Sequence, residues 1–227
     1  FIKDLHKYIE YAHKKGFIDI MINNNGSAVT KKRAQQILDS GLTRLRFSLD
    51  AQNSDTYSKV RVGSIALDRV KRNIETFLDL KEKGGYKLPI VGVSFCKLKQ
   101  NENEVDEFTN YWRDKVDIIS IQKFVPPTPN KDKYKEYYTS DQYHEKVLDK
   151  FNCVQPYQRL VIKNQNIYPC CVSFNKNLVL GSIRSTRIYD AWHSKKMSDL
   201  RELHKRGTYK EDPTCKTCVE LIYPPKA

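Results

Sequence analysis

Apolar side chains in the first half of the chain alternate between two periodicities. Leu5, Ile9 and Ala12 recur at helical spacing, and residues 17–22 follow as a short apolar strand. The alternation continues and predicts helices over 30–38, 64–83 and 102–114, and strands over 43–50, 90–95 and 116–124. Strands and helices at this spacing form right-handed parallel β/α units. We therefore predict an α/β fold whose first domain, residues 1–124, is an open sheet or a barrel of such units.

The predicted strand over residues 43–50 suggests a ligand site. One face of it is apolar and suits packing against helices, whereas the other carries Arg46, Ser48 and Asp50. Strands of a parallel sheet are normally covered on both faces and are apolar throughout. The polar face therefore favours a ligand cavity, and a solvated edge strand is the alternative. In β/α folds such chemistry lies in the loops after the carboxyl ends of the strands.

Residues 125–152 interrupt the alternation. They contain clustered prolines and many tyrosines, and they predict a linker with one short helix near 141–150. Five of the six cysteines follow this segment, so we expect a second, cysteine-rich unit over residues 153–227. Within it the pattern predicts a hairpin over 160–168 and a helix over 186–206.

The cysteines of this second unit indicate a metal or cluster site. Cys215 and Cys218 form a C-x2-C motif, which we expect to be a turn that brings two thiolates onto one metal. The predicted hairpin would return Cys170 close to Cys153, so four thiolates would converge. Zinc, an iron–sulfur cluster and two disulfides all remain open. Disulfides are the least favoured, because Cys96, interpreted as a buried thiol on a strand, is left over and the Lys-rich composition is that of an intracellular protein.

The net charge of +13, from 40 Lys and Arg against 27 Asp and Glu, raises the alternative of a nucleic-acid-binding protein. The basic residues are spread along the chain and form no block tail, so we do not expect nucleic acid to be the main partner. The alternative function is a zinc-stabilised basic protein in which the four cysteines form a structural site and the positive charge binds nucleic acid or another acidic partner. No run approaches the ~20 apolar residues of a membrane helix, so no membrane is expected.

A set of motifs runs through the second unit: Cys153, Asn164-Gln165-Asn166-Ile167-Tyr168-Pro169-Cys170-Cys171, Leu180-Gly181-Ser182-Ile183, Ile188-Tyr189-Asp190-Ala191-Trp192, Arg201 and Cys215-x2-Cys218. They resemble the SPASM domain, a small α+β extension of many radical S-adenosylmethionine (SAM) enzymes whose shorter form holds one auxiliary 4Fe-4S cluster. The resemblance implies that Cys153, Cys170, Cys215 and Cys218 hold this cluster. Cys171 remains an alternative to Cys170, which is favoured because it directly follows Pro169, as in the family motif.

The first domain resembles part of the β/α barrel of the same superfamily. The similar segments are residues 22–26 (INNNG), 47–51 (FSLDA) and 57–61 (YSKVR), which occur in the family's order. The resemblance implies that Asn25, Ser48 and Arg61 lie near the SAM cofactor. The alternatives are structural: Asn25 would complete a turn, Ser48 would cap a strand end, and Arg61 would form a surface ion pair.

The sequence lacks the C-x3-C-x2-C loop and the Gly-Gly-Glu strand end of radical SAM enzymes. Because the chain begins inside a helical pattern at Phe1, we expect a fragment that shows strands three to six of the barrel and does not cleave SAM by itself. The resemblance implies that the complete, cytoplasmic enzyme carries a second 4Fe-4S cluster and generates a 5′-deoxyadenosyl radical. That radical would abstract hydrogen from a peptide, protein or carbohydrate substrate, with a flavodoxin or ferredoxin as electron donor.

Overall fold

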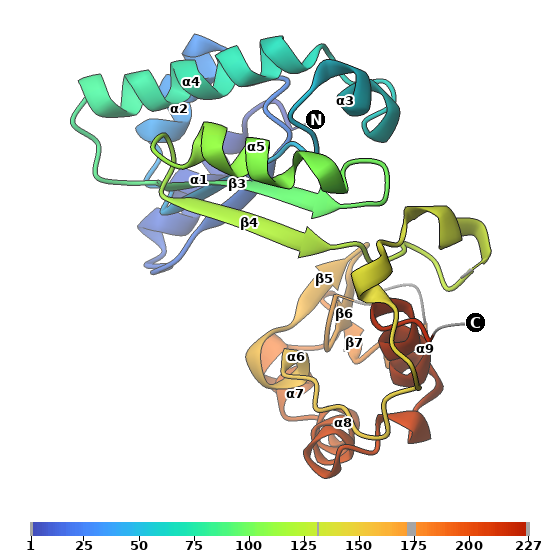
Figure 1. The fold of residues 1–227 in the computed structure, drawn as a ribbon. Helices are drawn as coiled ribbons and strands as arrows, with labels where there is room; N and C mark the ends of the chain where they lie inside the picture. Colours follow the sequence, from blue (N-terminus) through green and yellow to red (C-terminus); the bar gives the residue numbers. More distant parts are fainter. Residues whose placement is uncertain (1, 131, 172–175, 226–227) are drawn as a thin grey trace. The chain divides into compact units, whose positions relative to one another are not determined.

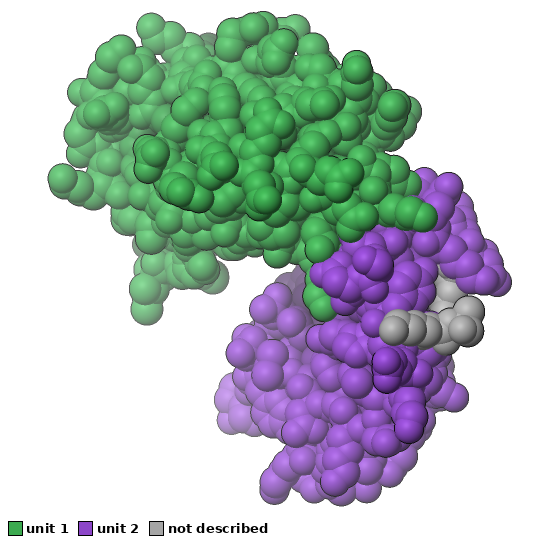
Figure 2. All heavy atoms as spheres, in the orientation of Figure 1, with its two compact units in different colours: residues 1–124 green, residues 125–227 purple. Residues whose placement is uncertain are grey.

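The chain folds into two units, residues 1–124 and residues 125–227, which Figure 2 shows in different colours. The computed structural model describes residues 2–130, 132–171 and 176–225. Strands and helices alternate in the first unit, whereas short helices and a small sheet make up the second (Figure 1). Among the residues described, no helix combines the length and the apolar character needed to cross a membrane.

A parallel sheet of four strands is the framework of the first unit. In spatial order its strands are β1 (Met21–Asn24), β2 (Arg44–Ser48), β3 (Ile90–Lys97) and β4 (Ile118–Lys123). The connecting helices are α1 (Leu5–Lys14), α2 (Lys31–Leu38), α3 (Ser54–Val60), α4 (Leu67–Lys83) and α5 (Val105–Trp112), with a 3-10 turn η1 (Glu102–Glu104) before α5. Strands that pair in parallel and in chain order are those expected of a partial β/α barrel, so the predicted fold class is confirmed.

The helices pack on the apolar face of this sheet. Leu45 and Phe47 of β2 are buried in one core with Ile74 and Phe77 of α4 and with Trp112 of α5. The rings of Phe47 and Phe77 meet edge to face, with their centroids 5.9 Å apart. The apolar side of the predicted strand 43–50 is therefore the side that meets the helices.

The other face of the sheet is polar at its centre. Arg46 pairs in register with Gly92, and Ser48 pairs with Ser94. The hydroxyl of Ser94 donates to that of Ser48 over 3.3 Å. A side-chain Cβ at Gly92 would approach the backbone oxygen of Ile118 to 3.1 Å, so the close spacing of β3 and β4 favours glycine there.

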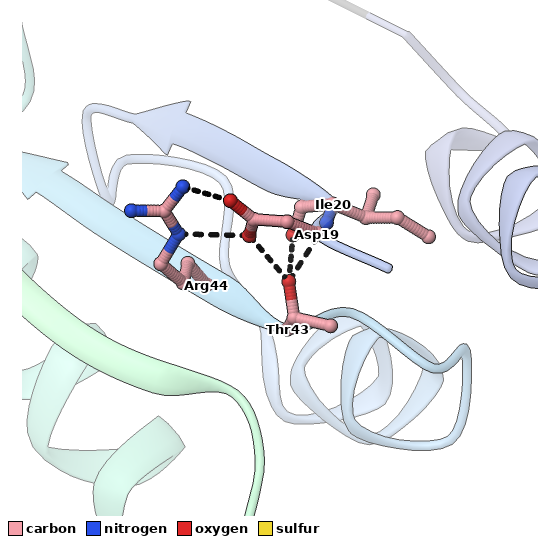
Figure 3. Close-up of polar contacts among 4 residues, drawn as sticks. All are labelled: Asp19, Ile20, Thr43 and Arg44. Carbon is pink, nitrogen blue, oxygen red and sulfur yellow. Dashed lines mark hydrogen bonds and ion pairs between the residues drawn. The ribbon is translucent and has the colours of Figure 1, made fainter. Parts of the chain in front are cut away.

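A polar cluster fixes the register of β1 against β2 (Figure 3). The carboxylate of Asp19 accepts hydrogen bonds from Thr43 Oγ1 at 2.9 Å and Arg44 Nε at 2.8 Å, and it forms an ion pair with Arg44. The backbone N–H of Ile20 donates to Thr43 Oγ1 over 2.7 Å. The hydrogen bonds from Arg44 and Thr43 lower the pKa of Asp19 below its ordinary value. The cluster lies where Met21 pairs with Arg44.

Two local predictions for the first unit differ from the structure. The strand expected over residues 17–22 begins only at Met21, and Phe17 and Ile18 are 63% and 94% exposed. Phe17 instead closes the end of α1, because its N–H donates to Ala12 O at 3.2 Å. Helix α3 was not predicted. The side chain of Asn53 caps this helix by accepting hydrogen bonds from the backbone N–H groups of Asp55 and Thr56.

A small antiparallel sheet and several short helices make up the second unit. Its strands are β5 (Val161–Lys163), β6 (Asn166–Tyr168) and β7 (Gly181–Ser182). Its helices are α6 (Gln155–Gln158), α7 (Ile188–Trp192), α8 (Lys195–Arg206) and α9 (Pro213–Ile222), with 3-10 turns η2 (Asp132–Tyr137), η3 (Ser140–Gln142), η4 (Lys176–Leu178) and η5 (Tyr209–Glu211). The hairpin predicted over 160–168 is present, and both turn residues, Asn164 and Gln165, have positive φ angles of 49° and 69°. Such angles are typical of a two-residue hairpin turn.

Residues 125–152, which we expected to be a linker, pack within the second unit. The buried Tyr138 donates its hydroxyl to Leu221 O at 2.8 Å, and the N–H of His144 donates to Pro224 O at 2.9 Å. The helix predicted near 141–150 is wrong, since only η3 overlaps that range. The helix predicted over 186–206 is instead two helices, because Ser194 ends the first and caps α8.

Candidate cofactor sites

The first candidate site is a cavity of about 650 Å³ at the carboxyl ends of β1 and β2. Asn25 follows β1, Ser48 ends β2, and Arg61 follows α3. All three line this cavity, so the structure brings together the residues for which the resemblance implied a place near SAM. Their role in binding SAM stays a prediction.

Arg61 is held on one side by an ion pair and has a free donor. Its Nη2 lies 2.5 Å from Asp50 Oδ2, and the two side chains are only 28% and 16% exposed. Asp50 is fixed in turn, because its Oδ1 accepts a hydrogen bond from Cys96 N at 2.8 Å. The Nε of Arg61 is buried with no hydrogen-bond partner among the described residues. A buried cationic donor of this kind suits an anionic group in the cavity.

The other two predicted residues also have structural partners. Asn25 Oδ1 accepts hydrogen bonds from Ser27 N at 3.1 Å and Ser27 Oγ at 2.7 Å, as the turn alternative requires. Ser48 contacts Ser94, as described above. These contacts fix the positions of both side chains beside the cavity.

Asn23 and Asn24, at the strand end where the sequence predicted the chemistry to lie, also line this cavity. Sequence reasoning missed four other polar residues of the lining: Lys3, His6, Arg33 and Gln36. These four lie on or just before α1 and on α2, and only the packing of these helices brings them to the strand ends.

The second candidate site is a smaller cavity of about 230 Å³ in the second unit. Five cysteines line it: Cys153, Cys170, Cys171, Cys215 and Cys218. Most of the other lining side chains are apolar, including Leu178, Leu200, Val219 and Ile222. Within the described residues, no three Cys, His, Asp or Glu side chains are close enough to hold a single metal ion. The thiols therefore surround a common cavity without meeting at one point.

Cys215 and Cys218 lie on helix α9, and the turn expected from their C-x2-C spacing is wrong. Asp212 caps this helix, because its Oδ1 accepts hydrogen bonds from Thr214 N at 2.9 Å and Cys215 N at 2.8 Å. Pro213 occupies the first helical position, where its missing N–H is tolerated. The spacing of three residues then places both thiols on one face of the helix, toward the cavity.

Burial raises the pKa values of the cavity thiols. The pKa of Cys218 rises to about 12, and that of Cys153 also lies above its ordinary value. The pKa of Cys215 is raised by burial and by the nearby Asp212 carboxylate. The thiols therefore resist losing their protons in the unliganded cavity, and a bound metal centre would favour their ionised form. Cys96 lies on β3, outside the cavity, and burial raises its pKa to about 11, as expected of an inert thiol.

His204 also lines the cysteine cavity, and it was not among the predicted residues. It lies on the buried face of α8 with Met197 and Leu200, and it is 3% exposed. The N–H of Cys153 is 3.3 Å from its Nδ1, and Cys215 Sγ is 3.4 Å from its Nε2. Burial lowers the pKa of the imidazole below its ordinary value.

The cysteine cavity lies within a match to a known family. Residues 153–219 match the SPASM family, an iron–sulfur cluster-binding domain. All five cysteines of the cavity lie inside the matched range.

Two curated relatives are similar to parts of this chain. A probable GTP 3',8-cyclase of Methanococcus maripaludis (strain C5) is 30% identical over 126 residues, which are 56% of this chain and 40% of the relative. An S-adenosyl-L-methionine-dependent 2-deoxy-scyllo-inosamine dehydrogenase of Niallia circulans is 36% identical over 53 residues, which are 23% of this chain and 21% of the relative. The chain thus spans less than half the length of these relatives.

Two solved structures are similar in fold to this chain. A structure of anSMEcpe with bound AdoMet and Kp18Cys peptide has a TM-score of 0.60 at 12% identity, and the match covers 95% of this chain and 70% of the other. A complex of BtrN with AdoMet and 2-DOIA has a TM-score of 0.50 at 18% identity and covers 95% and 66%. The resemblance to radical SAM enzymes with a SPASM domain, from which we expected 4Fe-4S and SAM cofactors, is thereby confirmed.

Proposed function

We propose that this chain is the part of a radical SAM/SPASM enzyme that holds one auxiliary 4Fe-4S cluster and contributes to a SAM site. The observation that carries the proposal is the cavity lined by five cysteines of the SPASM domain. The proposed ligands are Cys153, Cys170, Cys215 and Cys218. Cys171 is exposed whereas Cys170 is partly buried, which favours Cys170 as the ligand.

The donor set of this cavity fits an iron–sulfur cluster. Thiolates are the ligands of such clusters, and apolar walls shield a cluster from water and tune its potential. When bound, the cluster would supply an electron acceptor for a substrate radical or an anchor for the substrate. The chain's own part is positional: the Asp212 cap holds the first turn of α9, and with it Cys215, in place.

The cavity of the first unit is the proposed SAM site. Arg61 offers a partly paired guanidinium to an anionic group, and Asn25 and Ser48 offer hydrogen-bonding groups to a polar ligand. For the complete enzyme we propose a 5′-deoxyadenosyl radical that abstracts hydrogen from a peptide, protein or carbohydrate, with a flavodoxin or ferredoxin as electron donor. The two structural relatives are complexes with a peptide and with 2-DOIA, which supports these substrate classes.

Metal analysis of anaerobically purified and reconstituted protein tests the proposal. We expect about four iron and four sulfide per chain, with broad visible absorption. One zinc and no sulfide would contradict the proposal and favour the zinc-stabilised basic binding protein.

The chain by itself is proposed not to cleave SAM, because it lacks a C-x3-C-x2-C motif. Reconstituted protein incubated with SAM and dithionite should form no more 5′-deoxyadenosine than a protein-free control. Formation of 5′-deoxyadenosine in proportion to protein would show that the auxiliary site, or another site of this chain, supports the cleavage.

A further inference from the structure

His204 connects two of the proposed cluster ligands. It lies on α8, and its two ring nitrogens face different cysteines: Nδ1 lies 3.3 Å from the backbone nitrogen of Cys153, and Nε2 lies 3.4 Å from Cys215 Sγ. Cys153 precedes α6, and Cys215 lies on α9. One buried imidazole therefore connects α8 to the nearby helix α9 and to Cys153, which lies 51 residues earlier in the sequence.

The contact with Cys153 determines where the imidazole carries its proton. A backbone N–H can only donate, so Nδ1 must be the acceptor and carries no proton. A neutral imidazole with an accepting Nδ1 has its proton on Nε2. A doubly protonated ring would point an N–H of Nδ1 at the N–H of Cys153, two donors facing each other in a buried place.

The tautomer determines the direction of the second contact. Nε2–H is the donor and Cys215 Sγ the acceptor, at a distance suited to a hydrogen bond to sulfur. A thiolate that binds iron is a stronger acceptor than a thiol, so cluster binding strengthens this contact.

We propose that His204 is a positioning residue of the auxiliary cluster, which anchors the backbone of Cys153 and donates an N–H···S hydrogen bond to the cluster ligand Cys215. This inference rests on the proposed function. A hydrogen bond to a ligand sulfur stabilises the more negative, reduced cluster and raises its reduction potential. His204 thus favours electron uptake by the cluster.

Substitution of His204 tests the inference through the potential of the cluster. In His204→Leu, the midpoint potential of the cluster should fall by ~59 mV. For a one-electron couple this makes the ratio of reduced to oxidised cluster about tenfold lower at the midpoint potential of the wild type. Electron paramagnetic resonance during a redox titration measures this ratio. His204→Gln, whose amide offers one acceptor and one donor, should restore most of the wild-type potential. His193→Leu, at an exposed histidine after α7, is the matched control and should leave it unchanged.

The possible outcomes separate the inference from the proposed function. Normal uptake of iron and sulfide by His204→Leu with an unchanged potential would overturn the inference alone. Wild-type protein that takes up no iron and sulfide would overturn the proposed function and the inference with it.

A measurement on wild-type protein decides the case if His204→Leu fails to fold. Histidine labelled with the heavy nitrogen isotope should give a weak nitrogen coupling to the reduced cluster, which His193→Leu retains. No histidine coupling, or one as strong as that of a histidine bound directly to iron, would overturn the hydrogen-bonding role.

Discussion

The two cavities of this chain differ in the polar groups that line them. Beside apolar side chains, the cavity of the first unit has amides, guanidinium groups and the Ser48 hydroxyl, whereas the cavity of the second unit has thiols among mostly apolar walls. The first suits a polar molecule that enters and leaves through hydrogen bonds and ion pairs. The second suits a centre that is held by bonds to sulfur and shielded from water.

The two cavities also differ in how complete they are without a ligand. In the first, Asn25 is hydrogen-bonded to Ser27 and Arg61 is paired with Asp50. In the second, several thiols with raised pKa values face one another, and only a positive centre balances their ionisation. We therefore expect substitutions at the second site to abolish binding and those at the first to weaken it.

The largest expected effect is the loss of the cluster from the cysteine variants. Cys215→Ala or Cys218→Ala should remove nearly all bound iron and sulfide, because each leaves one iron without its thiolate. Cys96→Ala is the matched control, since Cys96 lies on β3 outside the cavity, and it should retain the cluster. Iron and sulfide assays on reconstituted proteins measure both. Equal loss from Cys96→Ala would overturn the ligand assignment.

A core substitution in the first unit should lower the free energy of unfolding without removing the cluster from the cysteine cavity. Phe77→Ala removes a fully buried ring that contacts Phe47, so it should lower the free energy of unfolding by about 3–5 kcal/mol. Phe17→Ala, at a mostly exposed ring, should change it by no more than about 0.5 kcal/mol. Urea unfolding measures both, and cluster absorbance without urea should match the wild type. Loss of the cluster from Phe77→Ala would show that the two sites depend on one core.

Removing the guanidinium of Arg61 should weaken SAM binding. We expect Arg61→Ala to raise the dissociation constant about tenfold, which corresponds to ~1.4 kcal/mol. Lys59→Ala removes an equal charge from the exposed side of α3 and should leave the constant unchanged. Equilibrium dialysis with labelled SAM compares the variants. An equal rise of the dissociation constant in Arg61→Ala and Lys59→Ala would show that SAM binding depends only on the net positive charge.

The smallest effect is expected at the hydrogen-bonded group around Asp19 that Figure 3 shows. Hydrogen bonds from Arg44 and Thr43 lower the pKa of Asp19, so its stabilisation is complete above the ordinary pKa of 3.8 and is lost as the pH falls through the lowered value. Asp19→Asn should therefore lower the melting temperature slightly at neutral pH and not at the acid end. Asp79→Asn, which removes an exposed carboxylate paired with Lys83, is the control. A larger loss at acid pH than at neutral pH would contradict this sign.

Periodicity predicted the first unit better than the second. Helices such as α4 repeat their buried positions over several turns, at Val70, Ile74 and Phe77, and this repetition identifies them in the sequence. Helix α3 has seven residues, of which only Tyr57 is buried, so no period could develop. Residues 125–152 also lack a periodic pattern of apolar residues. The position of Tyr138 follows only from its hydrogen bond to Leu221, which is distant in the sequence.

The cysteine site was predicted from residue types and motif order, but its surroundings were not. The Asp212-Pro213 pair is a helix-start signal that shows why the C-x2-C motif is helical, and local reading could have found it. His204 could not be identified in this way, because its partners Cys153 and Cys215 approach it only after folding. Spacing thus predicts ligands, whereas residues such as His204 that contact them are found only from tertiary packing.

Mössbauer spectroscopy of the reconstituted wild-type chain, with total iron measured on the same sample, tests the central claim most directly. The account predicts that nearly all iron belongs to one 4Fe-4S cluster per chain, with about four iron atoms bound. A spectrum of mononuclear iron in a four-sulfur site, or a chain that binds one zinc and excludes iron, would contradict it.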